Sequence, residues 1–289
     1  MQHAVRGMCA GRRASDIMYE MTTNPFHSVT HVATLGAALD RLGTVFQRFE
    51  AQDSGCISYG LLASGQRWFV KGASTPQGIS SLRRAVSFHQ SVSHQAIVPL
   101  MNSFTTEDGL VLVYPWMSGE VLYHPTLSRQ GGRAAPDSPM ARFRAQPLPL
   151  IHAALECILS AHLAVEEAGF VAVDFYDGCM LYDFDEHRVV LCDLDEYRAG
   201  PFVLEVDRLP GSMRYMAPEE FVRGSLIDIR TTVFALGRAL RLLLDAGDQE
   251  KEWRGTPEQL EVVRTATATD PERRFPSVRS LVGAWQTAA

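Results

Sequence analysis

The sequence lacks the features that define several large classes of protein. No apolar run approaches the ~20 residues that a membrane-spanning helix needs, and no run of basic residues suggests a nucleic-acid or membrane surface. The chain has 27 basic and 33 acidic residues, so its net charge is −6. Arginines near the amino terminus are not followed by an apolar core, so they do not predict a secretory signal. These absences predict a protein with neither a nucleic-acid nor a membrane partner.

Cysteine is also scarce, and its pattern argues against a metal site or a disulfide framework. The five cysteines, at positions 9, 56, 157, 179 and 192, form no Cys-x-x-Cys pair and no metal-ligand spacing. Their number is odd, which does not suit a complete set of disulfides. We therefore predict reduced thiols in an intracellular protein, located in the cytoplasm.

The remaining composition predicts a globular chain of the mixed α+β class. Of 289 residues, 46% are hydrophobic, which suits one large domain or two small lobes. Residues 1–33 are predicted to be a flexible leader, and residues 119–147, rich in Gly, Pro, Arg and Ser, a mobile insertion. Hydrophobic periodicity predicts strands at 44–50, 56–63, 67–71 and 110–114, and helices at 34–42, 79–92, 148–168 and 233–244.

The most informative stretch is Gly169–Glu219. Two short β-type runs, Cys179–Tyr182 and Arg188–Cys192, flank a polar turn, which is the pattern of a hairpin. Asp174 precedes the first strand and Asp193 follows the second, so a hairpin brings two carboxylates to one edge of a small sheet. Two such carboxylates suit a metal–nucleotide site, in which one orients a hydroxyl group and the other holds Mg²⁺.

This stretch resembles the catalytic and activation segments of protein kinases. Asp174 lies where the family has its catalytic-loop aspartate, five residues before Cys179. Asp193–Asp195 takes the place of the Asp-Phe-Gly motif. Ala217–Glu219 is an intact Ala-Pro-Glu motif, preceded by the run Gly211–Met216.

The resemblance covers residues 44–286 and implies a divergent bacterial Ser/Thr protein kinase with a two-lobed protein-kinase-like fold. The small β-rich lobe comprises residues 34–114. The larger helical lobe comprises residues 115–289, beginning with the hinge between the lobes. In this family MgATP binds between the lobes, so the resemblance implies ATP and Mg²⁺ or Mn²⁺ as cofactors.

The resemblance also assigns roles to individual residues. Asp174 and Lys71 are the implied catalytic residues, and Lys71 ends an apolar strand, where a buried amine needs an anionic partner. Asp193 is the implied metal ligand, and Asp177 or Asp195 supplies a second carboxylate. The other implied ATP-binding residues, from the glycine-rich loop and the hinge, are Gly55, Ile57, Tyr114 and Trp116.

Several positions depart from the family pattern. Ala85 stands where helix C has the glutamate that pairs with the lysine, and no acidic residue occurs from residue 54 to residue 106. Gln52–Ile57 lacks the first two glycines of the phosphate-binding loop, so its backbone approaches phosphates less freely. Cys179 replaces a metal-binding asparagine, and a thiol suits Mg²⁺ poorly because hard cations prefer oxygen. Thr232 replaces a buried aspartate of the family.

Three functions stay open on the sequence alone. The first is a protein kinase that transfers the γ-phosphate of ATP to a protein hydroxyl, which the segment Gly211–Glu219 favours. The second is a kinase-fold phosphotransferase that acts on a small molecule. The third is a pseudokinase, a nucleotide-binding or scaffold module without transfer activity. The retained Lys71, Asp174 and Asp193 favour an enzyme over a pseudokinase.

Two structural expectations accompany these functions. The spacing of the Ala-Pro-Glu motif and a later Asp-Pro-Glu-Arg-Arg run predicts a buried bidentate ion pair between Glu219 and Arg274. His162 shares the apolar face of the helix at 148–168, so we expect a core position rather than a catalytic one.

Overall fold

The computed structural model describes residues 24–49, 55–124 and 132–289. The chain divides into two compact units, one ending at Ser118 and one beginning at Gly119. We call them the small unit and the large unit and describe each by itself. The fold is of the mixed α+β class, with a five-stranded antiparallel sheet and several helices.

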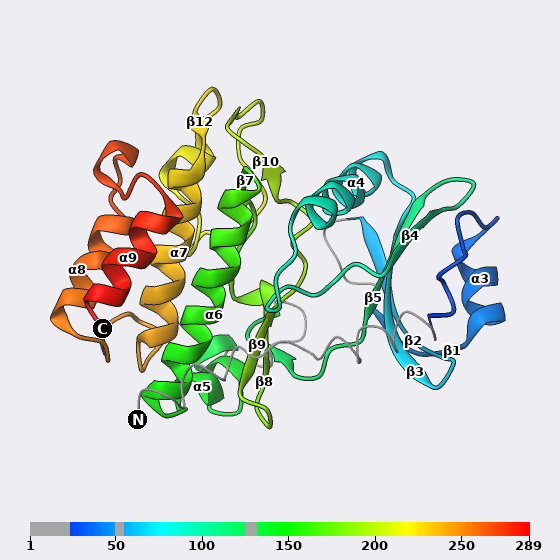
Figure 1. Ribbon diagram of the computed structural model, residues 1–289, viewed down its shortest axis with the longest axis horizontal. Coiled ribbons are helices and arrows are strands. Elements are labelled where there is room, and N and C mark those ends of the chain that lie inside the picture. Colours follow the sequence, from blue (N-terminus) through cyan, green and yellow to red (C-terminus); the bar gives the residue numbers. More distant parts are fainter. Residues whose placement is uncertain (1–23, 50–54, 125–131) are drawn as a thin grey trace. The chain divides into compact units, whose positions relative to one another are not determined.

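The small unit is built around this five-stranded sheet, whose strand order is β1-β2-β3-β5-β4. Helices α3 and α4 lie on opposite sides of the sheet (Figure 1). Successive residues of a strand point to opposite faces, so each strand contributes to two different environments. The elements are α3 (Leu35–Leu42), β1 (Thr44–Phe49), β2 (Cys56–Ala63), β3 (Gln66–Ala73), α4 (Pro76–Ser91), β4 (Asn102–Thr105) and β5 (Leu110–Pro115).

One face of the sheet packs on residues that precede α3. The Phe26 side chain is fully buried there, stacked on Phe104 with 6.1 Å between ring centroids and edge-on to Trp68 at 6.2 Å. Phe26 belongs to the core of the small unit and Val29 and Val32 pack against that core, although all three lie within the predicted flexible leader, 1–33. Residues 1–23 of the predicted leader lie outside the described residues.

Helix α4 covers the other face of the sheet. The Thr75 hydroxyl accepts a hydrogen bond from the Gly78 backbone N–H at 3.1 Å, and a proline follows at the first helical position, where its missing N–H costs nothing. Its buried residues recur at helical spacing: Gly78, Ser81, Leu82, Ala85 and Phe88. Ala85, where the resemblance expects a glutamate, therefore lies on the buried face of α4.

The large unit is mainly helical. Helices α6, α7, α8 and α9 pack against one another, and short strands joined by loops lie beside them (Figure 1). The helices are α5 (Pro139–Arg144), α6 (Leu148–Glu167), α7 (Ile229–Leu244), α8 (Pro257–Ala266) and α9 (Val278–Thr287). The strands are β6 (Glu120–Val121), β7 (Phe170–Val171), β8 (Met180–Asp183), β9 (Arg188–Leu191), β10 (Arg198–Ala199), β11 (Phe202–Val203) and β12 (Leu226–Ile227). Single 3₁₀ turns are η1 (Gly132–Ala134), η2 (Asp177–Cys179), η3 (Pro218–Phe221) and η4 (Pro271–Arg273).

Strands β8 and β9 form the predicted hairpin, and β6 joins it to make a three-stranded sheet. Met180 lies opposite Leu191, and Asp183 lies opposite Arg188 at the turn. The Asp183 carboxylate accepts hydrogen bonds from two backbone N–H groups of the turn, Asp185 at 3.0 Å and Glu186 at 3.1 Å. This side chain fixes the turn and hence the register of the hairpin.

Helix α6 is the central helix of the large unit. By length and composition it is the one helix in the described part of the chain that is apolar enough to cross a membrane. However, 56% of its most apolar window is buried inside the protein, as in a core helix of a soluble protein. His162 is fully buried in this helix, and its Nδ1 lies 2.7 Å from the Ile158 carbonyl oxygen. The expected core position of His162 is thus confirmed.

The segment predicted to be a mobile insertion, 119–147, is anchored where the structure describes it. It contains β6, η1 and α5, and Met140 and Phe143 of α5 are fully buried. The Arg144 guanidinium, also buried, donates to the Leu242 carbonyl oxygen through two nitrogens, at 2.9 and 3.0 Å. The composition of this segment predicted mobility, but a few large buried side chains hold its described part in place.

The cysteines agree only in part with the prediction. Cys56, Cys179 and Cys192 carry reduced thiols. Cys157, on α6, is disulfide-bonded, which contradicts the expectation of five reduced thiols. The cytoplasmic location stays a prediction.

Candidate active site

The β8–β9 hairpin brings Asp174 and Asp193 together at one end. Asp174 precedes η2, which leads into β8, and Asp193 follows β9. The Cys179 thiol donates a hydrogen bond to the Asp174 carbonyl oxygen at 3.2 Å and contacts the Asp193 carbonyl oxygen at 3.8 Å. One buried side chain therefore ties the backbones of both aspartates to the hairpin.

Both aspartates have an uncommon backbone conformation. The φ angle is 60° at Asp174 and 57° at Asp193, in the left-handed region. Aspartate tolerates this region better than most residues, and residues held there concentrate at functional sites. Asp193 is exposed and Asp174 is half-buried, so both reach the surface of the protein.

Negative charge gathers at this end of the hairpin. Burial, and then the charges of Asp174 and Asp193, raise the pKa of the Cys179 thiol well above its usual range. Burial and the same neighbouring charges also raise the pKa of the Tyr176 phenol. Cys179 does not suit Mg²⁺ as a ligand, because hard cations prefer oxygen to sulfur. The carboxylate oxygens do fit a hard divalent cation.

Asp177 lies in the same loop but faces a different partner. It is buried, and its two carboxylate oxygens accept hydrogen bonds from Arg133 Nε at 2.5 Å and Nη2 at 2.8 Å. The Arg133 guanidinium also lies over the Tyr123 ring, 3.4 Å from its centroid. Asp177 would have to leave this ion pair to bind a metal, so the structure favours a role in holding the loop over the predicted role as a ligand.

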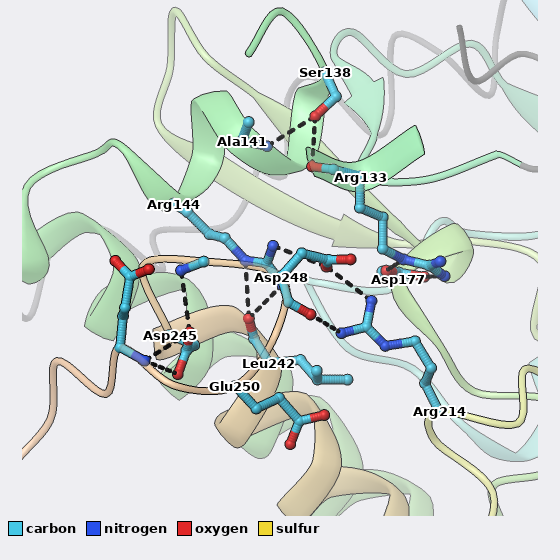
Figure 2. A network of polar contacts seen from close by, with 12 residues as sticks. Arg133, Ser138, Ala141, Arg144, Asp177, Arg214, Leu242, Asp245, Asp248 and Glu250 are labelled. Atoms are coloured by element: carbon cyan, nitrogen blue, oxygen red, sulfur yellow. Dashed lines mark hydrogen bonds and ion pairs between the residues drawn. The ribbon is translucent and has the colours of Figure 1, made fainter. Parts of the chain in front are cut away.

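A second group of polar contacts is centred on Asp248 (Figure 2). Asp248 accepts hydrogen bonds from Arg144 at 3.0 Å and from Arg214 at 2.8 Å. Arg144 belongs to α5, Arg214 to the segment before the Ala-Pro-Glu motif, and Asp248 to the loop after α7. The same carboxylate thus connects three segments that are far apart in sequence.

Asp195 is placed differently from Asp193. Asp195 is buried, whereas Asp193 is exposed two residues earlier. Among the described residues, no group of three or more His, Cys, Asp or Glu side chains is arranged as a metal site. The metal, and the choice of Asp195 as a second ligand, stay predictions.

The segment before the Ala-Pro-Glu motif packs directly on Asp174. A side chain at Gly211 would lie 3.7 Å from the Asp174 Cα atom and 3.1 Å from the Met216 side chain, and its φ of +145° also suits glycine. Buried Glu220 lies nearby, and its carboxylate accepts a hydrogen bond from the Ala217 N–H at 2.6 Å. Burial raises the pKa of Glu220 to about 8.

Glu219 and Arg274 form the predicted bidentate ion pair. Arg274 Nη1 and Nη2 lie 2.7 and 2.8 Å from the two Glu219 carboxylate oxygens. The Arg274 side chain is 0% exposed and the Glu219 side chain 9%. The Thr231 hydroxyl donates to the same carboxylate at 2.8 Å. This confirmed pair joins the Ala-Pro-Glu motif to α7 and the η4 region.

Thr232 supports the loop that carries Asp174. It is fully buried on α7, and its hydroxyl oxygen accepts a hydrogen bond from the Ala172 backbone N–H at 3.0 Å. Ala172 lies two residues before Asp174. A neutral hydroxyl at this position therefore anchors the chain just before the candidate catalytic residue.

In the small unit, Lys71 lies on the sheet face that α4 covers. It is only 5% exposed and is paired across the sheet with Ser58 on β2 and Leu112 on β5. The Ala85 side chain on α4 supplies no charge to this face. A buried ammonium group on a sheet face suits an anionic ligand.

The two predicted loop residues lie at the start of β2. Gly55 has a φ of +70°, and a side chain there would lie 2.8 Å from the Thr75 hydroxyl. Ile57 is exposed. The rest of the predicted phosphate-binding loop, residues 50–54, lies outside the described residues.

The predicted hinge residues belong to an aromatic cluster, which we define as Phe46, Phe49, Phe69, Tyr114 and Trp116. Their ring centroids are 4.9–6.4 Å apart in successive contacts. Phe69 lies two residues before Lys71 on β3, so both point to the same face of the sheet. Flat aromatic faces of this kind stack on nucleobases.

Three residues that shape these sites, Phe69, Phe49 and Arg133, were not among the predicted site residues. Phe69 and Phe49 line the lysine face, and strand alternation around Lys71 was the signal for Phe69. Arg133 holds the loop after Asp174 from a segment predicted to be mobile. No local pattern marks such a long-range ion pair.

Comparison of the sequence with protein-family models finds no match, and comparison with curated proteins finds none either. The function of the chain is therefore inferred from its own residues.

Proposed function

We propose that the chain is a divergent kinase-like phosphotransferase, which transfers the γ-phosphate of ATP to a hydroxyl group and needs Mg²⁺ or Mn²⁺. In this proposal the small unit is the β-rich lobe and the large unit the helical lobe of a protein-kinase-like fold. The main support is the meeting of Asp174 and Asp193 at one end of the hairpin. Phosphoryl transfer needs mainly positioning and charge neutralisation, which two fixed carboxylates and a lysine supply.

Each retained residue has one role in this proposal. Asp174 orients the acceptor hydroxyl and accepts its proton, and Asp193 holds the divalent cation. Lys71 binds the α- and β-phosphates of ATP, and Tyr114 and Trp116 bind the adenine. Asp195 is the candidate for a second metal ligand, since Asp177 is engaged by Arg133.

A protein is the favoured acceptor. The segment packed on Asp174 presents apolar side chains at the surface, among them Met213, which is 71% exposed. Val203, Val222 and Leu226 of the same region are also exposed. Exposed apolar side chains grouped beside a site suit a macromolecular surface better than a small polar metabolite.

A nucleotide-binding module without transfer activity is the second candidate. It is favoured by the buried Cys179 thiol in place of an oxygen ligand and by Ala85 in place of an acid. Both substitutions weaken the hold on the metal and phosphates without affecting the adenine contacts.

Weak binding of the phosphates leads to the same prediction of ATP affinity for both candidates. We expect ATP to bind mainly through its adenine, with about a tenfold gain or less over adenosine, which is about 1.4 kcal/mol. Isothermal titration calorimetry with ATP and adenosine checks this. An ATP affinity far above that of adenosine would reveal a phosphate ligand not identified above.

The proposed activity is tested with labelled ATP, Mg²⁺ or Mn²⁺, and a cell lysate as a source of acceptors. Separation of protein from small molecules then shows where the label goes. Label in protein supports the protein kinase, and label in a small molecule supports the metabolite phosphotransferase. Nucleotide binding without labelled product in either pool supports the binding module and overturns the enzyme.

A further inference from the structure

We propose that Cys179 and Cys192 form a redox-active dithiol, a site of reversible oxidation by peroxide at the base of the two aspartates. The pair comes from opposite strands of the β8–β9 hairpin, one residue beyond each described strand. Its covalent state is independent of phosphoryl transfer, so the inference does not rest on the proposed function.

One backbone hydrogen bond places the two cysteines beside each other, just beyond the last register pair of the hairpin. Met180 pairs with Leu191 at the end of the ladder, and the Cys192 N–H beyond it donates to the Cys179 carbonyl oxygen at 2.9 Å, whereas the Cys179 N–H donates to the Tyr176 carbonyl oxygen within η2. Hydrogen-bonded pairs of antiparallel strands have Cα atoms about 5.5 Å apart. That separation lies within the range of about 4.4–6.8 Å that disulfides span.

Closing the bond requires a small movement. Opposed Cβ atoms in a sheet are about 4.5–5.5 Å apart, whereas a disulfide needs about 3.5–4.5 Å. The strand ends must therefore approach each other at Cys179 and Cys192. A bond formed under such strain is more easily reduced than a relaxed one, which suits a reversible site.

Access to solvent sets the order of the chemistry. Cys192 is half-buried, next to the exposed Asp193, whereas Cys179 is 1% exposed. An oxidant in solution therefore meets Cys192 first, and Cys179 is the neighbour that resolves the product.

The reaction consumes one hydrogen peroxide for each pair of thiols. The Cys192 sulfur attacks one peroxide oxygen, the O–O bond breaks, and water leaves with the thiol proton, giving a sulfenic acid. The Cys179 sulfur then attacks the Cys192 sulfur, the S–OH bond breaks, and a second water leaves with the Cys179 proton. Two thiols are oxidised to one disulfide, and the peroxide is reduced to two waters.

Oxidation has a direct consequence for Asp174 and Asp193. In the reduced protein the Cys179 thiol donates to the Asp174 carbonyl oxygen and contacts that of Asp193. A disulfide has no S–H to donate, and its formation moves the sulfur toward Cys192. The backbone of the loop that carries Asp174 then loses a contact, so its amide hydrogens should exchange faster.

The experiment treats the full chain with hydrogen peroxide, alkylates the remaining thiols and maps the cysteine peptides by mass spectrometry. We expect a linked pair of peptides containing Cys179 and Cys192, lighter by two hydrogen atoms and restored by dithiothreitol. Buried Cys56 in the small unit is the internal control and should stay alkylatable only after unfolding. Hydrogen exchange should quicken around Asp174 in the oxidised chain only.

Two variants sharpen the result. Cys192→Ser should abolish the link and leave Cys179 reduced, while Cys56→Ser, the matched control, should leave the link intact. If Cys179→Ser does not fold, the cysteine peptide maps of the wild type and of Cys192→Ser still test whether the disulfide forms. Oxidation of Cys192 to sulfinic acid with Cys179 still reduced would overturn the proposal. The proposal would also be overturned if the disulfide between Cys179 and Cys192 formed no faster in the folded protein than in the urea-unfolded chain.

Discussion

The candidate site residues of the two units lie in different surroundings. In the large unit, acids near Asp174 are bound by arginines from distant segments, as Arg133 binds Asp177 and Arg274 binds Glu219. In the small unit, Lys71 lies on a sheet face covered by α4 and flanked by the aromatic cluster. The position of the loops in the large unit thus depends on specific ion pairs, whereas apolar packing forms the small unit. With Ala85 in place of an acid on α4, we expect fixed carboxylates together with weak binding of phosphates.

The largest effect is expected at the buried ion pair of the large unit. Arg274→Ala leaves the Glu219 carboxylate buried without its partner, which costs about 3–5 kcal/mol of unfolding free energy. Denaturant unfolding measures the loss. The matched control is Arg264→Ala, which breaks the exposed Arg264–Glu261 pair, 3.3 Å apart, and should cost less than about 1 kcal/mol. Equal stability of the two variants would contradict the prediction that the buried ion pair contributes more to the unfolding free energy than the exposed pair.

In the small unit, the corresponding large effect should come from an apolar side chain. Phe26→Ala empties a fully buried site against Phe104 and Trp68, which costs about 3 kcal/mol. Thermal or denaturant unfolding checks the value. A loss below about 0.5 kcal/mol, as at a surface position, would contradict a core role for Phe26 and support the prediction of a flexible leader.

In the large unit we also expect the unfolding free energy to depend on pH through Glu220. The pKa of Glu220 is about 8 in the folded protein, above its ordinary value of 4.5, because burial disfavours the charged carboxylate. The folded state therefore holds an extra proton between these values, and the contribution of Glu220 to stability falls as the pH rises from about 4.5 to about 8. The slope is up to about 1.4 kcal/mol per pH unit.

Glu220→Gln tests this effect, because a neutral amide keeps an oxygen acceptor for the Ala217 N–H and cannot titrate. The unfolding free energy of the variant should vary less with pH over this interval than that of the wild type. Glu219, Asp174 and Arg274 also act on Glu220 electrostatically and are unchanged in the variant. An unaltered slope would show that another group is responsible.

Local patterns predicted much of the fold. Hydrophobic periodicity predicted strands at 56–63 and 67–71, where β2 and β3 lie, and a helix at 148–168, where α6 lies. The hairpin and the meeting of Asp174 with Asp193 followed from two short apolar runs and a polar turn. These features depend on interactions between residues close in sequence.

The parts that sequence reasoning missed depend on distant partners. The short strand β4 carries one buried apolar residue, Phe104, and its Asn102 amide donates to the Phe26 and Val29 carbonyl oxygens, 2.6 and 2.9 Å away. Residues 24–33 were assigned to the leader for the same reason. The Arg133–Asp177 pair likewise joins residues 44 positions apart. No periodicity within either segment indicates such contacts.

The most direct test of the proposed function compares the two aspartates. The measurement is metal-dependent transfer of the ATP γ-phosphate, with ATP affinity measured alongside, by the wild type, Asp193→Ala and Asp174→Ala. We expect Asp193→Ala to abolish metal-dependent transfer. Asp174→Ala should lower turnover by about 100-fold or more with ATP affinity nearly unchanged, because an orienting base acts mainly in the transition state. Asp185→Ala, an exposed aspartate at the opposite end of the hairpin, should match the wild type. Transfer that is absent from the wild type, or unaffected by Asp174→Ala, would contradict the enzyme.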